Sequence, residues 1–175
     1  MCVGHDPKKL SAALSEVLES DRKIRCFAYD FDRTVGNLFA YDAEKKVFPV
    51  YSDAEPLVQP IVRHYISIIT SGDHHRQREK VLRSHLQVDD LSITKHAPGK
   101  VQCVKVLLKK YGAPIIFVDD KAQTHDAIRD RFAEGEVILY HMVRDDAAYP
   151  EQYKHNHTIV DSLKPIFDLM ELNNQ

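Results

Sequence analysis

Short apolar runs alternate with helical segments along this chain, and this alternation constrains the fold more than any other feature. Runs typical of buried strands lie at residues 23–29, 65–70, 91–94, 115–118, 137–141 and 158–160. Segments with helical periodicity lie at 11–20, 53–63, 73–86, 99–111, 124–132 and 162–172. Strands that alternate with helices predict a parallel sheet joined by right-handed crossovers. We therefore expect an α/β fold, a three-layer Rossmann-like sheet with helices on both faces.

The length of the chain, 175 residues, is typical of one domain with a full hydrophobic core. No internal repeat, low-complexity tract or linker divides it, so we expect a single domain over residues 1–175. Two aromatic, β-like pieces at 37–41 and 47–51 flank a charged stretch. This pattern predicts a small flap hairpin at about residues 36–51.

Bulk charge argues against two classes of partner. The formal net charge is −2, so the chain has no general field for nucleic acid or an anionic membrane. No apolar run is long enough to span a bilayer, and the first residues lack the apolar core of a signal peptide. Its three cysteines are odd in number and lack metal-binding spacing. We therefore expect a cytoplasmic protein without a membrane or nucleic-acid partner.

Two pairs of acidic residues follow predicted strands. Asp30 and Asp32 end the first strand, and Asp119 and Asp120 end the run at 115–118. In an open α/β sheet the carboxyl edge of the strands is where ligands bind. Carboxylates that lie so close together repel one another unless a cation or hydrogen bonds compensate them. The four acids therefore predict a site for one hard divalent cation, Mg²⁺.

Further polar residues at predicted strand and helix ends fit the needs of phosphoryl transfer. Asp30 would be a carboxylate nucleophile that forms an aspartyl-phosphate, and Asp32 would protonate the leaving group and then activate water. Thr70 and Ser71 end the second strand, and Lys100 starts a helix. Their hydroxyl groups and positive charge suit the binding of phosphoryl oxygens.

Four motifs in this order resemble those of the haloacid dehalogenase-like (HAD) hydrolases. They are Tyr29-Asp30-Phe31-Asp32-Arg33-Thr34, Ile68-Ile69-Thr70-Ser71-Gly72, Lys100, and Phe117-Val118-Asp119-Asp120. A response-regulator receiver domain uses similar parts, but its acidic pair comes first and its lysine last, whereas here Lys100 precedes Asp119. The resemblance spans about residues 23–170 and implies a HAD-like fold.

The resemblance assigns roles residue by residue. It implies that Asp30 is the nucleophile, Asp32 the acid/base, Thr70 the hydroxyl of the second motif and Lys100 the lysine of the third. Asp120 matches the metal-ligating acid and Asp119 its acidic neighbour, while the backbone carbonyl of Asp32 would be a further metal ligand. Dehalogenases of this family lack an aspartate at the position of Asp32, so the resemblance favours a phosphatase or phosphotransferase.

Two residues depart from the family pattern. Arg33 stands where the family usually has glycine, and Asp126 lies farther along the chain than the second acid of the fourth motif usually does. These departures leave open a phosphate- or partner-binding module with little catalysis. Lys95 competes with Lys100 for the third motif, but Lys100 is better placed at a helix start.

The spacing of the motifs leaves no room for a large cap domain after the first or second motif. The resemblance therefore implies the capless branch of the family, with a site open to a small phosphorylated molecule or to a phosphate exposed on a macromolecule. The neighbouring His74 and His75 are more typical of an exposed helix start than of substrate ligands. A homo-oligomer that covers the site also stays open.

Overall fold

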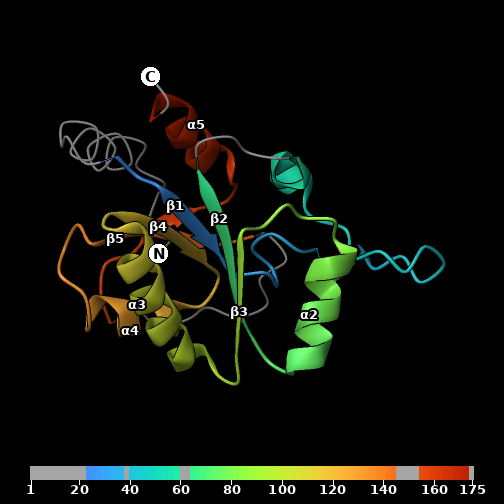
Figure 1. The fold of residues 1–175 in the computed structure, drawn as a ribbon, viewed down its shortest axis with the longest axis horizontal. Coiled ribbons are helices and arrows are strands. Elements are labelled where there is room, and N and C mark those ends of the chain that lie inside the picture. Colours follow the sequence, from blue (N-terminus) through green and yellow to red (C-terminus); the bar gives the residue numbers. More distant parts are fainter. Residues whose placement is uncertain (1–22, 38–39, 60–63, 145–153, 174–175) are drawn as a thin grey trace, which may run out of the picture.

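The computed structural model describes residues 23–37, 40–59, 64–144 and 154–173 (Figure 1). The helix expected at 11–20 lies outside these residues. Six strands form one parallel sheet in the order β3-β2-β1-β4-β5-β6. The strands are β1 (Cys26–Tyr29), β2 (Tyr65–Ser71), β3 (Asp90–Thr94), β4 (Ile115–Asp119), β5 (Val137–Met142) and β6 (Thr158–Val160). The α/β fold and all six expected strands are thus confirmed.

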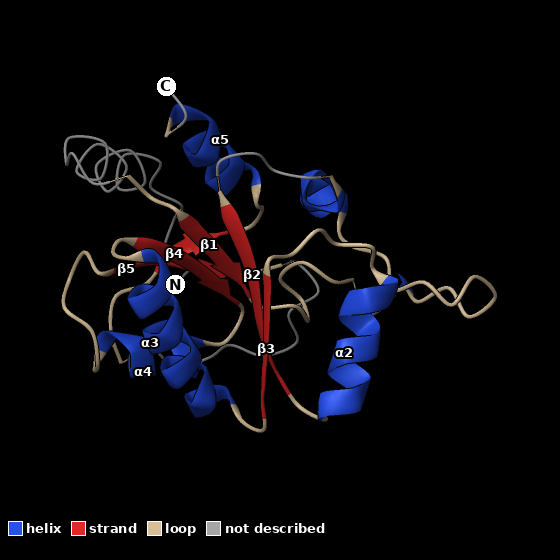
Figure 2. Ribbon diagram, in the orientation of Figure 1, coloured by secondary structure: helices blue, strands red, loops and turns tan. Residues whose placement is uncertain are grey.

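Helices cover both faces of the sheet, which gives the expected three layers (Figure 2). The helices are α2 (His74–Arg83), α3 (Lys100–Tyr111), α4 (Ala122–Arg129) and α5 (Lys164–Leu172), with 3₁₀ helices η2 (Ser52–Val58) and η3 (Ala97–Gly99). Alternate residues of the strands point to opposite faces. One face packs against η2, α2 and α5, through side chains such as Leu57, Val81 and Ile166. The other packs against α3 and α4, through side chains such as Val104 and Ile128.

One expected helix is shorter and of a different type. The segment predicted as a helix at 53–63 forms the 3₁₀ helix η2, which ends at Val58, and residues 60–63 lie outside the described part. Pro56 stands inside it, and proline removes a donor that a continuing α-helix needs. The Asp53 side chain accepts hydrogen bonds from Arg144 and from the backbone N–H of Leu163. It therefore joins η2 to the segment after β5 and to the residue before α5.

The expected flap segment contains antiparallel pairing but no strand of ordinary length among its described residues. Isolated bridges join Gly36 to Val50 and Asp42 to Val47. The Asp42 side chain accepts from the backbone N–H groups of Glu44 and Lys45, which closes the turn. In the described part of the chain no helix is long and apolar enough to cross a membrane.

Candidate active site

The predicted residues meet because of the strand order. β1 lies between β2 and β4, and Tyr29 is in register with Ile68 on one side and Val118 on the other. The carboxyl ends of these central strands therefore lie side by side. Asp30 follows β1 directly, and its backbone N–H donates to the carbonyl of Val118 over 2.8 Å. Thr70 and Asp119 lie at the ends of the two flanking strands.

Lys100 joins two of the acids at the floor of this edge. Its Nζ lies 2.5 Å from Asp30 Oδ1 and 2.7 Å from Asp119 Oδ2, and all three side chains are buried. Burial is the largest influence on the pKa of Asp30 and raises it well above its ordinary value, although Lys100 acts against this. Burial disfavours the charge of Lys100, but the two carboxylates outweigh it and raise the pKa of Lys100. The sequence prediction that Lys100 and the aspartates share one site agrees with this geometry.

Asp119 and Asp120 differ in how their oxygens are used. Both oxygens of Asp119 accept hydrogen bonds, Oδ2 from Lys100 and Oδ1 from the backbone N–H of Lys121 at 2.7 Å. Asp120 Oδ2 lies 3.1 Å from Lys121 Nζ, whereas its Oδ1 is buried with no hydrogen-bond partner in the described residues. Burial, followed by repulsion from Asp119, raises the pKa of Asp120 to about 6. Asp120 therefore has an oxygen available for a further ligand.

The acids fit the requirements of a hard cation. One oxygen from each of Asp30, Asp119 and Asp120 lies within 4.8 Å of the other two. Carboxylate oxygens are the protein ligands that Mg²⁺ accepts, usually one or two carboxylates together with waters and substrate. Asp30 and Asp120 suit direct ligation best, because both Asp119 oxygens already accept from protein donors. Asp119 then serves mainly to hold Lys100 in place.

A cavity of about 220 Å³ opens above these groups. Its lining residues are Asp30, Asp32, Arg33, Thr70, Ser71, Lys100, Asp120 and Lys121. The Thr70 hydroxyl is buried and has no hydrogen-bond partner among the described residues. An unpaired buried hydroxyl costs about 1–3 kcal/mol unless something binds it. A phosphoryl oxygen in the cavity would satisfy this group.

Asp32 lies at the side of the cavity and contacts helix α2. Lys80 Nζ lies 2.8 Å and 2.9 Å from its two carboxylate oxygens. Gln77 Nε2 donates to Asp32 Oδ2 at 2.9 Å and to the carbonyl of Ser71 at 3.0 Å. Neither Gln77 nor Lys80 was among the site residues expected from the sequence. The buried face of α2 carries Gln77, Lys80, Val81 and Ser84 at helical spacing, but only Val81 is apolar, so no apolar periodicity marked this face in the sequence.

Arg33 stands in a turn whose backbone conformation is typical of glycine. Arg33 has a φ of 63°, the left-handed region where glycine is the usual residue. The chain then returns, and the backbone N–H groups of Val35 and Gly36 both donate to the carbonyl of Phe31. A Cβ at Gly36 would lie 2.5 Å from the Phe31 ring. The tight turn thus requires glycine at Gly36, whereas position 33 keeps the glycine-like conformation with a larger side chain.

Two histidines support the loop that carries Asp119 and Asp120. His125 Nε2 lies 3.0 Å from the carbonyl of Asp119, and His141 Nε2 lies 3.0 Å from that of Asp120. Because a carbonyl only accepts, both ring nitrogens donate. Burial lowers the pKa of His125 to about 4, so its ring is neutral near pH 7. Sequence reasoning did not identify this layer, since the histidines come from α4 and β5 and meet only in the fold.

Asp126 faces the outer side of the same layer and not the cavity. It accepts from the backbone N–H groups of Lys154 and His155 and lies 3.1 Å from His157 Nε2. His157 Nδ1 in turn lies 3.1 Å from His141 Nδ1. Partial burial acts the other way, but the hydrogen bonds lower the pKa of Asp126 below its ordinary value. The displaced acid therefore anchors residues 154–157 to α4.

Other candidates lie away from the cavity. His74 and His75 are exposed at the start of α2, as expected for a helix start. Lys95 is also exposed and does not line the cavity, whereas Lys100, the other candidate for the third motif, does.

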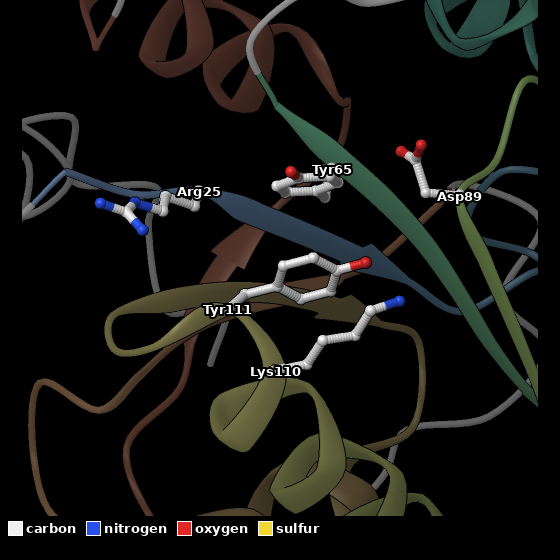
Figure 3. Close-up of a pocket in the computed structure, with 5 residues that line it drawn as sticks. All are labelled: Arg25, Tyr65, Asp89, Lys110 and Tyr111. Carbon is white, nitrogen blue, oxygen red and sulfur yellow. The ribbon is translucent and has the colours of Figure 1, made fainter.

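A larger cavity, of about 420 Å³, lies at the opposite, amino edge of the sheet (Figure 3). Several of its lining residues have hydrogen-bond or ion-pair partners nearby. Lys110 lies 2.8 Å from both oxygens of Asp90, the Tyr111 hydroxyl donates to the same carboxylate, and Asp89 accepts from the backbone of Ile66 at 2.8 Å. The rings of Tyr65 and Tyr111 stack with centroids 4.4 Å apart. These contacts brace the start of the sheet, whereas the unpaired oxygens of Thr70 and Asp120 lie at its carboxyl edge.

Comparison with solved structures finds proteins of similar fold. One match is a dehalogenase determined with an intermediate complex, with a TM-score of 0.62 and 10% identity over 86% of this chain and 98% of that chain. A second is a protein of Mesorhizobium loti named as a HAD-like phosphatase, with a TM-score of 0.51 and 12% identity over 87% of each chain. The fold is that of the haloacid dehalogenase-like hydrolases.

At these identities the likeness concerns the HAD-like fold alone. No protein-family model matches the chain, and no curated protein matches its sequence. One neighbour is described as a dehalogenase and the other as a phosphatase, so the neighbours by themselves do not choose between these chemistries. The choice depends on the residues of the site.

Proposed function

We propose that the protein is a Mg²⁺-dependent phosphatase that hydrolyses phosphomonoesters through an aspartyl-phosphate on Asp30. The observation that carries the proposal is the buried contact of Lys100 with Asp30 and Asp119 at the floor of a cavity that Asp32 also lines. A nucleophilic carboxylate, a fixed positive charge and a second carboxyl group are the parts that a two-step phosphoryl transfer requires. A halide leaves without receiving a proton, so a dehalogenase does not need Asp32 as a general acid.

The side chains divide the reaction between them. Lys100 holds Asp30 Oδ1, which leaves Oδ2 to attack the phosphorus atom. Lys100 and the Thr70 hydroxyl then bind phosphoryl oxygens and stabilise their charge. Asp32 gives a proton to the departing alkoxide and later takes one from the water that attacks the phosphoenzyme. When bound by Asp30, Asp120 and the Asp32 carbonyl, Mg²⁺ would supply positive charge that offsets the carboxylates and attracts the substrate phosphate.

The substrate class follows from the shape of the site. A cavity of about 220 Å³ suits a phosphate group with a small part of its ester. We propose a substrate that is a small phosphorylated molecule or a phosphate exposed on a macromolecule, since we expect no large cap over the site. Free Cys26 and Cys103 accord with a reducing compartment, and we propose a cytoplasmic location.

The first experiment assays a panel of phosphomonoesters with Mg²⁺ and with a chelator. We expect turnover that needs the cation, and we expect Asp30→Asn to abolish it while circular dichroism shows that the variant is still folded. Equal activity of purified Asp30→Asn protein would remove Asp30 as the nucleophile. Binding of Mg²⁺ and phosphate without turnover across the panel would instead favour a binding module, and product analysis would detect transfer to an acceptor other than water.

The second experiment tests the cation site. Calorimetric titration of Mg²⁺ into wild type and Asp120→Asn should give weaker binding to the variant, because one carboxylate ligand is lost. The same substitution relieves repulsion between Asp119 and Asp120, so the cation-free variant should not melt below wild type. Equal Mg²⁺ affinities would exclude Asp120 from the metal shell.

A further inference from the structure

Asp32 is held by two residues that do not line the cavity. Lys80 contacts both of its carboxylate oxygens, at 2.8 Å and 2.9 Å, and Gln77 donates to one of them at 2.9 Å. Neither Lys80 nor Gln77 is among the residues that line the cavity. Both residues belong to helix α2. They therefore hold the carboxyl group without lining the cavity themselves.

The burial of this contact distinguishes it from an ordinary surface ion pair. The Lys80 side chain is 5% exposed and that of Asp32 25%. On the same helix, the ion pair between Arg83 and Glu79 is 40% and 36% exposed, the kind of pair that contributes only about 0–1 kcal/mol. A lysine is rarely so buried unless it is paired. Because Lys80 is buried, its ammonium group depends on the contact with Asp32 for a compensating charge.

The backbone around Gln77 is shaped for the same contact. Gln77 Nε2 also donates to the carbonyl of Ser71 at 3.0 Å. The next residue, Gly72, has a φ of 135°, and a Cβ there would lie 3.0 Å from Gln77 Nε2. A side chain at Gly72 would therefore press on the amide that binds Asp32. The loop after β2 and the first turns of α2 thus leave just enough space for the Gln77 amide that binds Asp32.

We propose that Lys80, together with Gln77, is a positioning residue that fixes the rotamer of Asp32, and thereby determines how well the protein cleaves phosphoesters with poor leaving groups. The inference rests on the proposed function and assigns a determinant of substrate class to the same site. Lys80 touches neither the nucleophile nor the cavity, so it acts only through Asp32.

The reason lies in what each leaving group requires. An alkoxide is strongly basic and must receive a proton as its bond to phosphorus breaks, whereas 4-nitrophenolate departs without one. General acid catalysis contributes about 10²–10⁴-fold when it is needed, and it depends on placing the acid within hydrogen-bond reach. A freely rotating Asp32 would lose part of this factor for alkyl phosphates. It would lose almost nothing for 4-nitrophenyl phosphate.

The test compares these two substrates in a set of full-length variants. Lys80→Met should lower kcat for an alkyl phosphate by about 10–100-fold and for 4-nitrophenyl phosphate by less than about 3-fold. Lys80→Arg, which keeps the charge, should recover part of the alkyl activity. Arg78→Met is the matched control, because Arg78 is exposed on the same helix, and it should leave both substrates unchanged.

A double-mutant cycle separates positioning from a purely structural effect. Asp32→Asn should show the same substrate pattern, and Lys80→Met should cost little more once Asp32 is gone. Equal losses on both substrates, or losses that multiply in the double variant, would overturn the inference. If Lys80→Met does not fold, Gln77→Met removes the second contact and must show the same alkyl-specific loss.

The two proposals fail in distinguishable ways. A wild-type protein that hydrolyses neither substrate, or an active Asp30→Asn, overturns the phosphatase and with it the positioning. A wild-type protein that needs Asp30 but shows no substrate-dependent loss in Lys80→Met keeps the phosphatase and rejects the positioning.

Discussion

Replacing Lys100 by methionine tests the electrostatic centre of the molecule, because it removes one cation from between two buried carboxylates. Lys100 is 1% exposed, and its partners Asp30 and Asp119 are 3% and 0% exposed. Water cannot readily take the place of the lost ammonium at such burial. Breaking a buried ion pair from one side typically costs about 3–5 kcal/mol. We expect Lys100→Met to lower the free energy of unfolding by this amount near neutral pH.

The loss should depend on pH in a direction that can be worked out. The pKa of Lys100 is raised, so its stabilising contribution is complete below the unfolded value of 10.5 and is lost only in strong alkali. The pKa of Asp30 is already above its ordinary value of 3.8, and removing Lys100 raises it further. Above pH 3.8 the folded variant then binds more protons than the unfolded chain. Acidification should therefore reduce the penalty over the pH range in which Asp30 is protonated in the variant and still ionised in wild type, by at most about 1.4 kcal/mol per pH unit for one carboxyl group.

Urea denaturation followed by circular dichroism measures this effect. The titrations are run at about pH 5 and about pH 8 with a chelator present, so that no cation replaces the ammonium. Lys105→Met is the control, because Lys105 is exposed on the same helix and should change stability by less than about 0.5 kcal/mol. A loss below about 1 kcal/mol at the higher pH, or one that grows on acidification, would refute the reasoning.

Three further outcomes follow from the geometry. Gly36→Ala should destabilise by about 1–3 kcal/mol, because the new Cβ would meet the fully buried Phe31 ring at 2.5 Å; an unchanged urea midpoint would contradict this. Mg²⁺ affinity in calorimetry should fall as the pH drops through about 6, since the pKa of Asp120 lies there and only its carboxylate binds the cation; equal affinities on both sides would oppose it. Burial raises the pKa of Cys26 to about 12, so iodoacetamide at mildly alkaline pH should modify it only after unfolding, as peptide mapping would reveal.

The strands and the acids at their ends were predictable because they depend on local sequence. A buried parallel strand reads as a short apolar run, and the polar residue that ends it, such as Asp30 or Asp119, lies next to that run. Parallel order then brings such ends to one edge without any further information. Lys100 was found for the same reason, since it starts the helix that precedes β4.

The residues that contact the site residues without lining the cavity, such as Lys80 and His141, were not predicted, because their partners are distant in sequence. Lys80 looks like one more charge in a charged helix until Asp32 is seen beside it. His141 reads as an ordinary strand residue, and its contact with the carbonyl of Asp120 depends on how β4 and β5 are aligned. The 3₁₀ form of η2 was also missed, although Pro56 inside this segment lacks the donor that a continuing α-helix needs.

The central position of β1 has a consequence for how this site could be altered. β1 is flanked on both sides by strands, whereas β3 and β6 form the margins of the sheet. Local unfolding of an edge strand therefore leaves the hydrogen bonds of β1 with β2 and β4 intact. Amide hydrogen exchange should be slowest in these central strands, which position Asp30. Residues on the connecting turns, such as Arg33 and Lys121, reach the cavity without belonging to that slow-exchanging unit. Substrate selectivity can thus be redesigned at residues of the turns without changing the strands that position the reactive groups.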